Sequence, residues 1–339
     1  MNWSLQTTRL RAPICLTWQI TGKCNLRCVH CLADSTDDCR EELDMSQIRN
    51  FLDDLAKMKV FYINIGGGEP LLHQNFFEIM DYAVHKDVYV QFSTNGTLIN
   101  STVAAEITKR GLRVQVSLDG WQPSVNNPIR GVGTFQKAVA AIRLLREKNV
   151  TVAINCVVTG ASIAGLDAML QLAVSYGAKL RLSRLRPAGR ALNQWWELVP
   201  SREQYVRLYQ WLMRHPEVNT GDSFFFLSSL GELLPGLSFC GAGKLTCSVD
   251  PQGFVYPCPF MMDPATVIGN VKTKPLSELW VEAELFSRMR TEEPRACVGC
   301  HSYSKCRGGC RGASYLVYGN WNMPDPECVR GEVNDKISI

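Results

Sequence analysis

Three cysteines near the start of the chain have the spacing of an iron–sulfur cluster site. Cys24, Cys28 and Cys31 form a C-x3-C-x2-C pattern that directly follows an apolar run from Ile14 to Ile20. Thiolates hold iron–sulfur clusters, and a four-iron cubane bound by three of them keeps one iron free for a ligand from outside the protein. A zinc loop is the alternative, because thiolates also bind zinc. The pattern therefore predicts a metal site, with an open cluster as the first interpretation.

This spacing resembles the signature of the radical SAM superfamily. In that family the open iron binds the amino and carboxylate groups of S-adenosylmethionine, and one electron breaks the S–C5′ bond to give methionine and a 5′-deoxyadenosyl radical. The resemblance implies that Cys24, Cys28 and Cys31 hold the radical-generating [4Fe-4S] cluster, and that an external one-electron donor is a partner. His30 stands where many relatives carry an aromatic residue, so we expect it beside the adenine.

The elements that must position these cysteines follow a regular pattern. From residue 14 to about 186, short β-rich runs alternate with helix-length amphipathic segments, which is typical of βα units around a parallel sheet. The predicted strands are Ile14–Ile20, Phe61–Ile65, Val88–Ser93, Arg113–Leu118, Thr151–Val158 and Lys179–Leu185. The predicted fold class is therefore α/β, with a partial (β/α)6 TIM-like barrel whose chemistry gathers at the C-terminal strand ends.

A glycine-rich turn with one carboxylate ends the second predicted strand. Glycines let the backbone approach a ligand closely, and a carboxylate can accept hydrogen bonds from an ammonium group. The superfamily resemblance implies that the motif binds the methionyl amine of the cofactor. The residues concerned are Gly67, Gly68, Glu69 and Pro70.

Short polar side chains also end the third and fourth predicted strands. In relatives, the corresponding positions contact the ribose and the methionyl carboxylate of the cofactor. The residues implied here are Ser93, Asn95, Ser117 and Asp119. For Asn95 and Asp119 the alternative is turn formation, because Asn-Gly and Asp-Gly are favoured turn pairs.

Arginines supply candidate ligands for a carboxylate. Strand alternation puts Leu180, Leu182, Arg184 and Arg186 on one face of the sixth strand, so this row is expected to end at the mouth of the barrel. Arginine binds carboxylates bidentately, which makes Arg184 and Arg186 candidates for the terminus of a substrate or the carboxylate of the cofactor. Arg130 is a similar candidate for the cofactor. A solvated ion pair is the alternative role for all three.

A second group of cysteines fills the C-terminal third. Its eight thiols are Cys240, Cys247, Cys258, Cys297, Cys300, Cys306, Cys310 and Cys328, enough for two clusters with four ligands each. The C-x2-C-x5-C-x3-C run from 297 to 310 resembles the SPASM domain of peptide-modifying radical SAM enzymes. That resemblance implies two auxiliary clusters, expected as [4Fe-4S], on Cys240, Cys247, Cys258 and Cys310 and on Cys297, Cys300, Cys306 and Cys328. Two zinc sites are the alternative.

The chain is thus predicted to have three parts. Residues 1–186 form the radical SAM core, residues 187–238 form a bridging segment with a helix from Ser201 to Arg214, and residues 239–339 form the SPASM domain. We expect metal rather than a large apolar core to hold this last part together. Cys15 and Cys156 are predicted to be buried fillers within strands, and Cys39 lies in a polar loop.

Composition narrows the class of protein. The 339 residues are 46% hydrophobic, and the 36 basic and 32 acidic residues give a net charge of only +4, too weak to predict nucleic-acid binding. No run of about 18 apolar residues predicts a membrane span, and Met1 is not followed by a signal-peptide pattern. We therefore expect a cytoplasmic protein, in which clustered cysteines more often bind metal than form disulfides.

Longer phrases of the sequence resemble the mycofactocin maturases. They include Arg184-Leu-Arg-Pro-Ala-Gly-Arg190, Cys240-Gly-Ala-Gly243 and Pro324-Asp-Pro-Glu-Cys328. The resemblance implies a two-step reaction on a short ribosomal precursor peptide. A C-terminal tyrosine is first decarboxylated oxidatively, and the product is then joined to the preceding valine by a carbon–carbon bond. Thioether formation or cysteine or serine oxidation by another SPASM maturase, and a zinc-stabilised binding scaffold, are the alternatives.

A further partner is expected from the N-terminal region. Many peptide-modifying relatives carry a precursor-recognition domain of their own, whereas only 13 residues precede the first predicted strand here. A flexible leader peptide needs a docking surface before its tail can reach a buried site. We therefore expect a separate small precursor-recognition protein.

Overall fold

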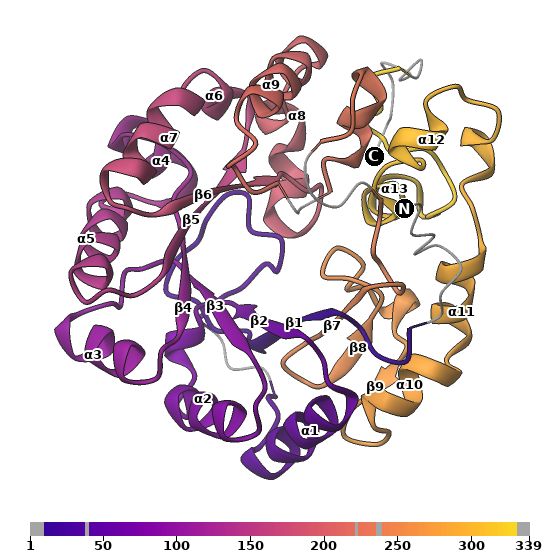
Figure 1. Cartoon of the computed structure of the whole chain (residues 1–339). Coiled ribbons are helices and arrows are strands. Elements are labelled where there is room, and N and C mark those ends of the chain that lie inside the picture. Colours follow the sequence, from indigo (N-terminus) through magenta and orange to yellow (C-terminus); the bar gives the residue numbers. More distant parts are fainter. Residues whose placement is uncertain (1–9, 38–40, 221–222, 235–238, 331–339) are drawn as a thin grey trace.

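The computed structural model describes residues 10–37, 41–220, 223–234 and 239–330. Within these ranges, nine strands form one curved sheet in the order β6-β5-β4-β3-β2-β1-β7-β8-β9. Figure 1 shows this sheet as an arc with helices around its outside, and the orange and yellow C-terminal third completes the right-hand side. The loop that follows β1 lies inside the arc.

Six of the strands were predicted from the sequence. The strands are β1 (Cys15–Thr21), β2 (Tyr62–Gly67), β3 (Val90–Thr94), β4 (Arg113–Ser117), β5 (Val152–Val158), β6 (Lys179–Arg184), β7 (Thr246–Val249), β8 (Phe254–Tyr256) and β9 (Gly269–Asn270). The first six pair in parallel with their neighbours, and each begins and ends within two residues of its predicted range. The predicted partial barrel is therefore confirmed.

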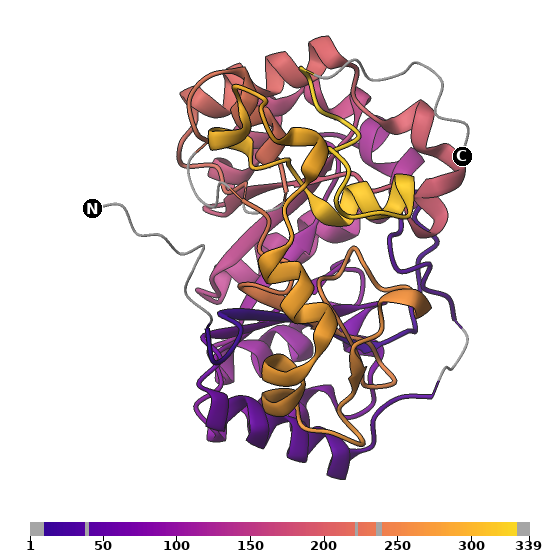
Figure 2. The ribbon, with the colours of Figure 1, turned by 90° about the vertical axis from the view of Figure 1, so that its right-hand side faces the viewer.

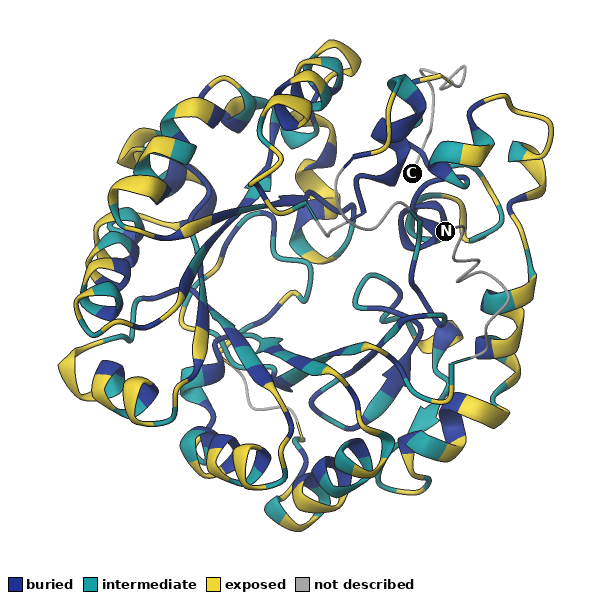
Figure 3. Cartoon of the chain, viewed as in Figure 1, coloured by how far each residue is buried: buried dark blue, intermediate teal, exposed yellow. Residues whose placement is uncertain are grey.

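The two faces of the sheet differ in polarity. Leu16, Ile63 and Phe92 belong to an apolar row that packs against the outer helices in one large core. Figure 3 shows the same layering, since the helix surfaces turned towards the sheet are buried and the outer surfaces are exposed. Successive side chains of a strand point to opposite faces. The intervening residues of the concave face are mostly polar, and they include Asn64, Ser93, Gln115, Ser117, Asn155, Arg181 and Ser183.

Helices cover the convex face and the C-terminal third. They are α1 (Met45–Met58), α2 (Phe76–His85), α3 (Ser101–Lys109), α4 (Pro123–Arg130), α5 (Thr134–Glu147), α6 (Gly160–Ile163), α7 (Leu166–Ser175), α8 (Trp195–Leu198), α9 (Arg202–Arg214), α10 (Leu276–Glu282), α11 (Glu284–Thr291), α12 (Tyr303–Cys306) and α13 (Arg311–Tyr318). The helix predicted in the bridging segment is α9. Ser201 and Gln204 form a capping box at its start, which fixes where it begins.

The C-terminal third shares the core of the barrel. β7 pairs in parallel with β1, and β8 and β9 continue the sheet in antiparallel fashion. Trp280 and Phe286, on α10 and α11, are fully buried in the same core cluster as the barrel strands. Figure 2 shows these orange helices lying along the edge of the barrel. The expectation that metal alone holds this region together therefore needs correction, because an extended apolar core also does so.

Two further observations concern the predictions of burial and of membrane spans. Cys156 is fully buried in β5 as predicted, whereas Cys15 at the start of β1 is partly exposed, and Cys39 lies outside the described residues.

None of the helices in the described part of the chain is long and apolar enough to cross a membrane. The predicted boundaries of the three parts, at residues 186 and 238, stay predictions.

Candidate functional site

The first cysteine group lies in the loop after β1, at the C-terminal edge of the sheet. Cys28 is buried, whereas Cys24 and Cys31 are partly exposed. The pKa of the Cys24 thiol is raised to about 11, mainly by burial and also by negative charge on Glu69, Cys28 and Cys31. The three thiols are therefore close enough to repel each other as thiolates. A bound cation removes that penalty, so this loop fits a metal centre.

Two glycines after β2 allow the cysteine loop to approach. Gly67 has a φ of +128°, and a Cβ atom there would stand 2.3 Å from the carbonyl oxygen of Thr21. A Cβ on Gly68 would stand 1.9 Å from the carbonyl oxygen of Lys23. Only glycine avoids both clashes. The predicted motif thus holds the backbone beside Cys24 against the end of β2.

Glu69 is completely buried at the end of the same motif. Its carboxylate accepts hydrogen bonds from the Thr94 hydroxyl at 2.7 Å, from the Asn95 amide at 2.8 Å and from the Leu71 amide at 3.3 Å. Burial raises the pKa of Glu69 to about 7, although these hydrogen bonds favour the ionised form. The side-chain amide of Asn95 reaches to 4.0 Å from the Cys24 sulfur. Glu69 and Asn95 therefore lie beside the cysteine loop, and their contacts with the cofactor stay predictions.

Asp119 is the centre of a buried charge cluster. One carboxylate oxygen lies 2.6 Å from Nε2 of His30 and 2.6 Å from Nε of Arg130, and the other accepts the Val157 amide at 2.8 Å. Burial opposes its ionisation, yet the charges of Arg130 and His30 hold the pKa of Asp119 well below its usual range. Nδ1 of His30 is buried without a hydrogen-bond partner among the described residues. That orphaned nitrogen fits a ligand, such as an adenine, that would bind beside the loop.

Arg130 joins this cluster to the cysteine loop. Its guanidinium lies 4.0 Å from the Cys28 sulfur, and the Arg130 side chain is almost fully buried against Asp119. The structure therefore places Arg130 and Asp119 in one ion pair, and their predicted contacts with the cofactor stay predictions. Ser93 and Ser117 lie on the concave face, where Ser93 accepts a hydrogen bond from Gln115 at 3.0 Å.

Arg184 does not line the mouth of the barrel. Leu180 and Leu182 point to the convex side of the sheet, into the core beneath the helices. Arg184 lies two residues after Leu182, so its side chain leaves the strand on the same side, away from the concave face. Its guanidinium binds Asp325 through two hydrogen bonds of 2.8 and 2.5 Å and contacts Glu327 at 2.5 Å. Asp325 and Glu327 both lie in the segment that follows α13, which we call the C-terminal segment. The expectation that Arg184 offers free donors to a substrate carboxylate is therefore corrected, because two buried carboxylates already occupy them.

The other predicted arginine lies among C-terminal residues. The guanidinium of Arg186 stacks over the Phe260 ring at 4.0 Å, and its positive charge acts on Cys258 and Cys310. The sequence did not single out Arg181, which faces the concave side and donates to Asn155 at 3.1 Å and to Ser183 at 3.2 Å. A signal for Arg181 is present in the sequence. Polar residues alternate with apolar ones along the strands, and the polar residues together form the concave face on which Arg181 lies.

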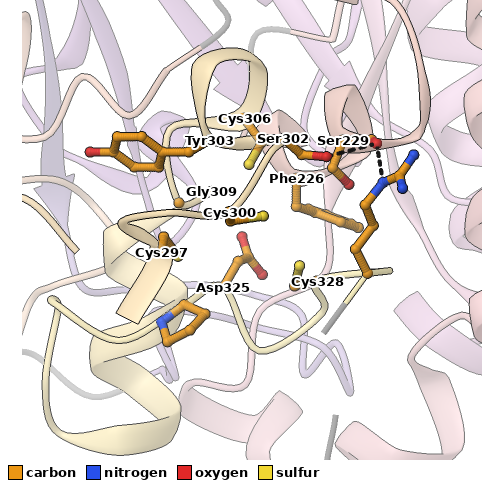
Figure 4. Close-up of a pocket in the computed structure, with 13 residues that line it drawn as sticks. Phe226, Ser229, Cys297, Cys300, Ser302, Tyr303, Cys306, Gly309, Asp325 and Cys328 are labelled. Atoms are coloured by element: carbon orange, nitrogen blue, oxygen red, sulfur yellow. Dashed lines mark hydrogen bonds between the residues drawn. The ribbon is translucent and has the colours of Figure 1, made fainter. Parts of the chain in front are cut away.

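Four of the C-terminal cysteines meet around one cavity. Figure 4 shows Cys297, Cys300, Cys306 and Cys328 around this space, with Asp325 among them. Burial raises the pKa of Cys297 to about 11, and the other three thiols act in the same direction. This set matches the ligands that the SPASM resemblance implied for one auxiliary cluster. The cavity therefore fits a four-thiolate cluster.

Three of the other four C-terminal cysteines also come together. The thiols of Cys240 and Cys310 share a hydrogen bond, charge on Cys258 acts on Cys240, and charge on Cys310 acts on Cys258. Cys247 is absent from this group, because its side chain belongs to the main core between β1 and β8. The structure thus brings together three of the four residues that the resemblance assigned to this cluster.

Among the residues with described positions, no three cysteine, histidine, aspartate or glutamate side chains converge closely enough to hold one ion. Tetrahedral zinc needs its sulfur ligands about 2.3 Å from a common point, whereas a cluster spreads them over several irons.

Comparison with known proteins identifies matches for both parts of the chain. Residues 18–173 match the radical SAM superfamily, and residues 240–307 match the SPASM iron–sulfur cluster-binding domain. The mycofactocin maturase MftC of Mycobacterium ulcerans is 46% identical over 95% of this chain and 89% of its own length. The mycofactocin maturase of Mycolicibacterium smegmatis is 44% identical over 95% of this chain and 84% of its own length.

Solved structures show the same fold. Streptococcus suis SuiB bound to S-adenosylmethionine has a TM-score of 0.76 at 16% identity, over 93% of this chain and 77% of that one. The protein anSMEcpe with bound AdoMet has a TM-score of 0.72 at 19% identity, over 93% of this chain and 94% of that one. At such low identities these two structures support the fold alone.

Proposed function

The chain belongs to the mycofactocin maturases, a family of radical SAM enzymes with a SPASM domain, and from that premise we propose the reaction and the residues that perform it. The substrate is a short ribosomal precursor peptide that ends in Val-Tyr. The first step removes carbon dioxide and two hydrogens from the terminal tyrosine. The second step joins the product to the preceding valine by a carbon–carbon bond.

One observation carries this proposal. The three-cysteine loop, the buried Glu69 and the orphaned nitrogen of His30 all gather at the C-terminal edge of the parallel sheet. When bound, S-adenosylmethionine and its cluster would supply a 5′-deoxyadenosyl radical, the species needed to remove a hydrogen atom from Cβ of the tyrosine. The remaining electron leaves for an acceptor, and the carboxylate leaves as carbon dioxide.

The chain's own residues hold and orient the cofactor. Glu69 accepts the methionyl ammonium, with the Thr94 hydroxyl and the Asn95 amide keeping its carboxylate in place. Cys24, Cys28 and Cys31 anchor the cluster, and Gly67 and Gly68 let this loop lie against the sheet. His30, whose ring is oriented by Asp119, would contact the adenine. Ser93 and Ser117 offer hydroxyl groups to the ribose and the cofactor carboxylate.

We assign the substrate carboxylate to Arg181 instead of Arg184. Arg181 lies on the concave face and is partly exposed. It is paired with Asn155 of β5, which in turn is paired with Ser117 of β4. Arg184 faces the C-terminal segment and is fully engaged there. An arginine in the interior of the barrel can bind the terminal carboxylate of the peptide through two hydrogen bonds while the Cβ hydrogen is removed.

Two partners complete the proposal. A separate small precursor-recognition protein docks the leader peptide, and an external donor supplies one electron for each radical formed. Two auxiliary [4Fe-4S] clusters in the SPASM domain serve as electron acceptors or relays for the oxidative step.

The decisive assay is anaerobic. Reconstituted enzyme is mixed with reductant, S-adenosylmethionine, the recognition protein and a peptide ending in Val-Tyr, and peptide mass and 5′-deoxyadenosine are measured together. Loss of carbon dioxide and two hydrogens, in step with deoxyadenosine, is the expected result. Deoxyadenosine with an unchanged peptide would reject this substrate. A product retaining the carboxylate but with a new thioether or an oxidised side chain would assign a different maturation.

Substitution of Arg181 tests the position of the substrate. Arg181→Gln should raise the KM for the peptide at least tenfold, because it removes a charge-assisted carboxylate contact of about 1.5–3 kcal/mol. Cofactor cleavage without peptide should change little. Lys179, exposed at the start of the same strand, provides the control Lys179→Gln. Equal effects of the two substitutions would remove Arg181 from the substrate site.

A further inference from the structure

We infer that Arg190 is a positioning residue for the radical-generating cluster, and that its positive charge makes this cluster easier to reduce. Arg190 lies 162 residues after Cys28, in the segment that follows β6. It can have this role only if Cys24, Cys28 and Cys31 hold the cluster, so the inference rests on the proposed function.

Arg190 holds two of the three cluster cysteines through their backbone. Its amide donates to the carbonyl oxygen of Cys31 at 3.0 Å, and its Nε donates to the carbonyl oxygen of Cys28 at 3.0 Å. Nη1 donates to the carbonyl oxygen of Ser35 at 2.9 Å and to the carboxylate of Asp34 at 2.7 Å. One residue therefore fastens both ends of the segment from Cys28 to Ser35. A guanidinium suits this task because its donors have a fixed planar geometry.

The residue before Arg190 allows this close contact. Gly189 has a φ of +55°, and a Cβ atom there would stand 2.3 Å from the carbonyl oxygen of Cys31 and 2.6 Å from that of Leu32. Only glycine fits so near to another stretch of backbone. The cysteine loop thus packs on Gly68 at its start and on Gly189 at its end.

A small apolar core keeps Arg190 in place. Gly189 and Arg190 begin the 3-10 helix η2 (Gly189–Gln194). Ala191 of this helix is buried together with Leu185 and Trp195, in a cluster separate from the main core. A side chain on an element supported in this way holds a site more precisely than one on a free loop.

The charge of Arg190 reaches the thiol of Cys28. Burial raises the pKa of this thiol, whereas the charges of Arg130 and Arg190 act in the opposite direction. Reduction adds one electron to a cluster, so nearby positive charge favours the reduced form and raises the reduction potential. Arg190 is therefore expected to help the cluster accept an electron from the external donor.

Arg190 is the less compensated of these two cations. Nε of Arg130 lies 2.6 Å from a carboxylate oxygen of Asp119, whose side chain is 0% exposed. The partner of Arg190 is Asp34, whose side chain is 57% exposed, so water screens its negative charge. Arg190 therefore contributes more net positive charge beside Cys28 than the pair of Arg130 and Asp119 does.

A redox titration tests the role of the charge. EPR spectra of the reduced holoenzyme are recorded with and without S-adenosylmethionine, and only the signal that the cofactor changes is followed, because it comes from the cluster with an open iron. Arg190→Gln should lower the midpoint potential of this signal by about 59 mV, a tenfold change in a one-electron equilibrium. Arg27→Gln removes an exposed charge from the same loop and should change this equilibrium less than about twofold. An unchanged potential in Arg190→Gln, or equal shifts in both variants, would overturn the inference.

Iron release tests the positioning role. With a chelator in excess, the signal that responds to S-adenosylmethionine should disappear about tenfold faster from Arg190→Gln than from Arg27→Gln, because support around metal ligands is worth at least that much. Iron–sulfur signals that the cofactor leaves unchanged should decay at the rate of the parent protein. Faster decay of all signals alike would mean general destabilisation and would overturn the positioning role.

Lysine separates charge from shape. Arg190→Lys keeps the charge but not the planar set of donors, so its potential should stay close to that of the parent while its iron release stays faster. If Arg190→Gln does not assemble the cluster, Arg190→Lys should still do so, and failure of both would overturn the role of the charge. A parent protein without a signal that responds to S-adenosylmethionine would instead refute the proposed function.

Discussion

At the scale of single residues, the backbone of Gly68 lies so close to Lys23 that only a glycine fits at this position. A Cβ on Gly68 would stand 1.9 Å from the Lys23 carbonyl oxygen, whereas a Cβ on Gly66 would meet nothing within 4 Å. Gly68→Ala should therefore displace the loop that carries Cys24, with loss of iron from that site and of cofactor binding. Gly66→Ala is the matched control and should retain both. Iron content and equilibrium binding of S-adenosylmethionine measure the difference, and equal behaviour of the variants would contradict it.

The proposed role of Glu69 predicts that cofactor binding depends on pH. Burial raises its pKa to about 7, so its ionised fraction grows as the pH rises through neutrality. The ammonium group of the cofactor needs the carboxylate form, and an α-amino group stays mostly protonated below about pH 7.7. Affinity should therefore increase roughly fivefold from pH 6 to pH 7.5, because the gain of carboxylate outweighs the partial loss of ammonium. Glu69→Gln should bind more weakly and without this slope, and a parent protein whose affinity is flat over this range would count against the role of Glu69.

Residue types and spacing predicted much of the site. The three cysteines and the Gly-Gly-Glu-Pro motif were recognisable because their chemistry depends on short sequence separations. Arg184 and Cys247 were harder, because their roles depend on which side of a strand faces the core. Alternation assigns the side chains of a strand to two faces but does not say which face the helices will cover. In β6 the apolar face is the one that the helices cover, and Arg184 lies on that face.

At the scale of elements, Arg184 joins the last barrel strand to the C-terminal segment. Asp325 binds Arg184 and also accepts the Cys310 amide at 2.8 Å, and it lines the cavity with Cys328. The Tyr205 hydroxyl of α9 binds Glu327. One buried ion cluster therefore connects β6, α9 and both auxiliary thiol groups.

Removal of Arg184 should destabilise the protein. Arg184→Ala leaves two buried carboxylates without their cation, and breaking a buried pair costs about 3–5 kcal/mol. Denaturant unfolding of the iron-free protein should show this loss in the free energy of unfolding. Arg27→Ala breaks an exposed pair with Asp37 and should cost less than about 1 kcal/mol. Similar losses in both variants would mean that the cluster is not a structural one.

The six barrel strands were predictable for a physical reason that does not hold for β7 to β9. Each barrel strand is a run of five to seven residues with β-branched or aromatic side chains, which is a clear local signal. β8 has three residues and β9 two, which is too short for a periodicity to appear. Their place in the sheet is defined by pairing with β7 and by core packing, and sequence patterns do not contain either.

At the scale of the whole molecule, one core extends through the barrel and the C-terminal third. Residues 1–238 alone should therefore expose the β1 edge and the surface that α10 and α11 cover. We expect this fragment to bind a hydrophobic dye and to unfold without a cooperative transition. The full chain stripped of iron by a chelator should keep a cooperative transition, because its apolar core is intact. A well-folded fragment would contradict the shared core.

The pairing of β1 with β7 has a consequence for synthesis of the chain. Cys15 is paired with Thr246, so one edge of β1 stays without its hydrogen-bonding partner until more than 200 further residues have been synthesised. At about 5–20 residues per second, the ribosome needs on the order of ten to fifty seconds to produce that partner. During this interval the nascent barrel has an open strand edge, which is a template for aggregation. Expression at a lower temperature or with added chaperones should therefore raise the yield of soluble enzyme.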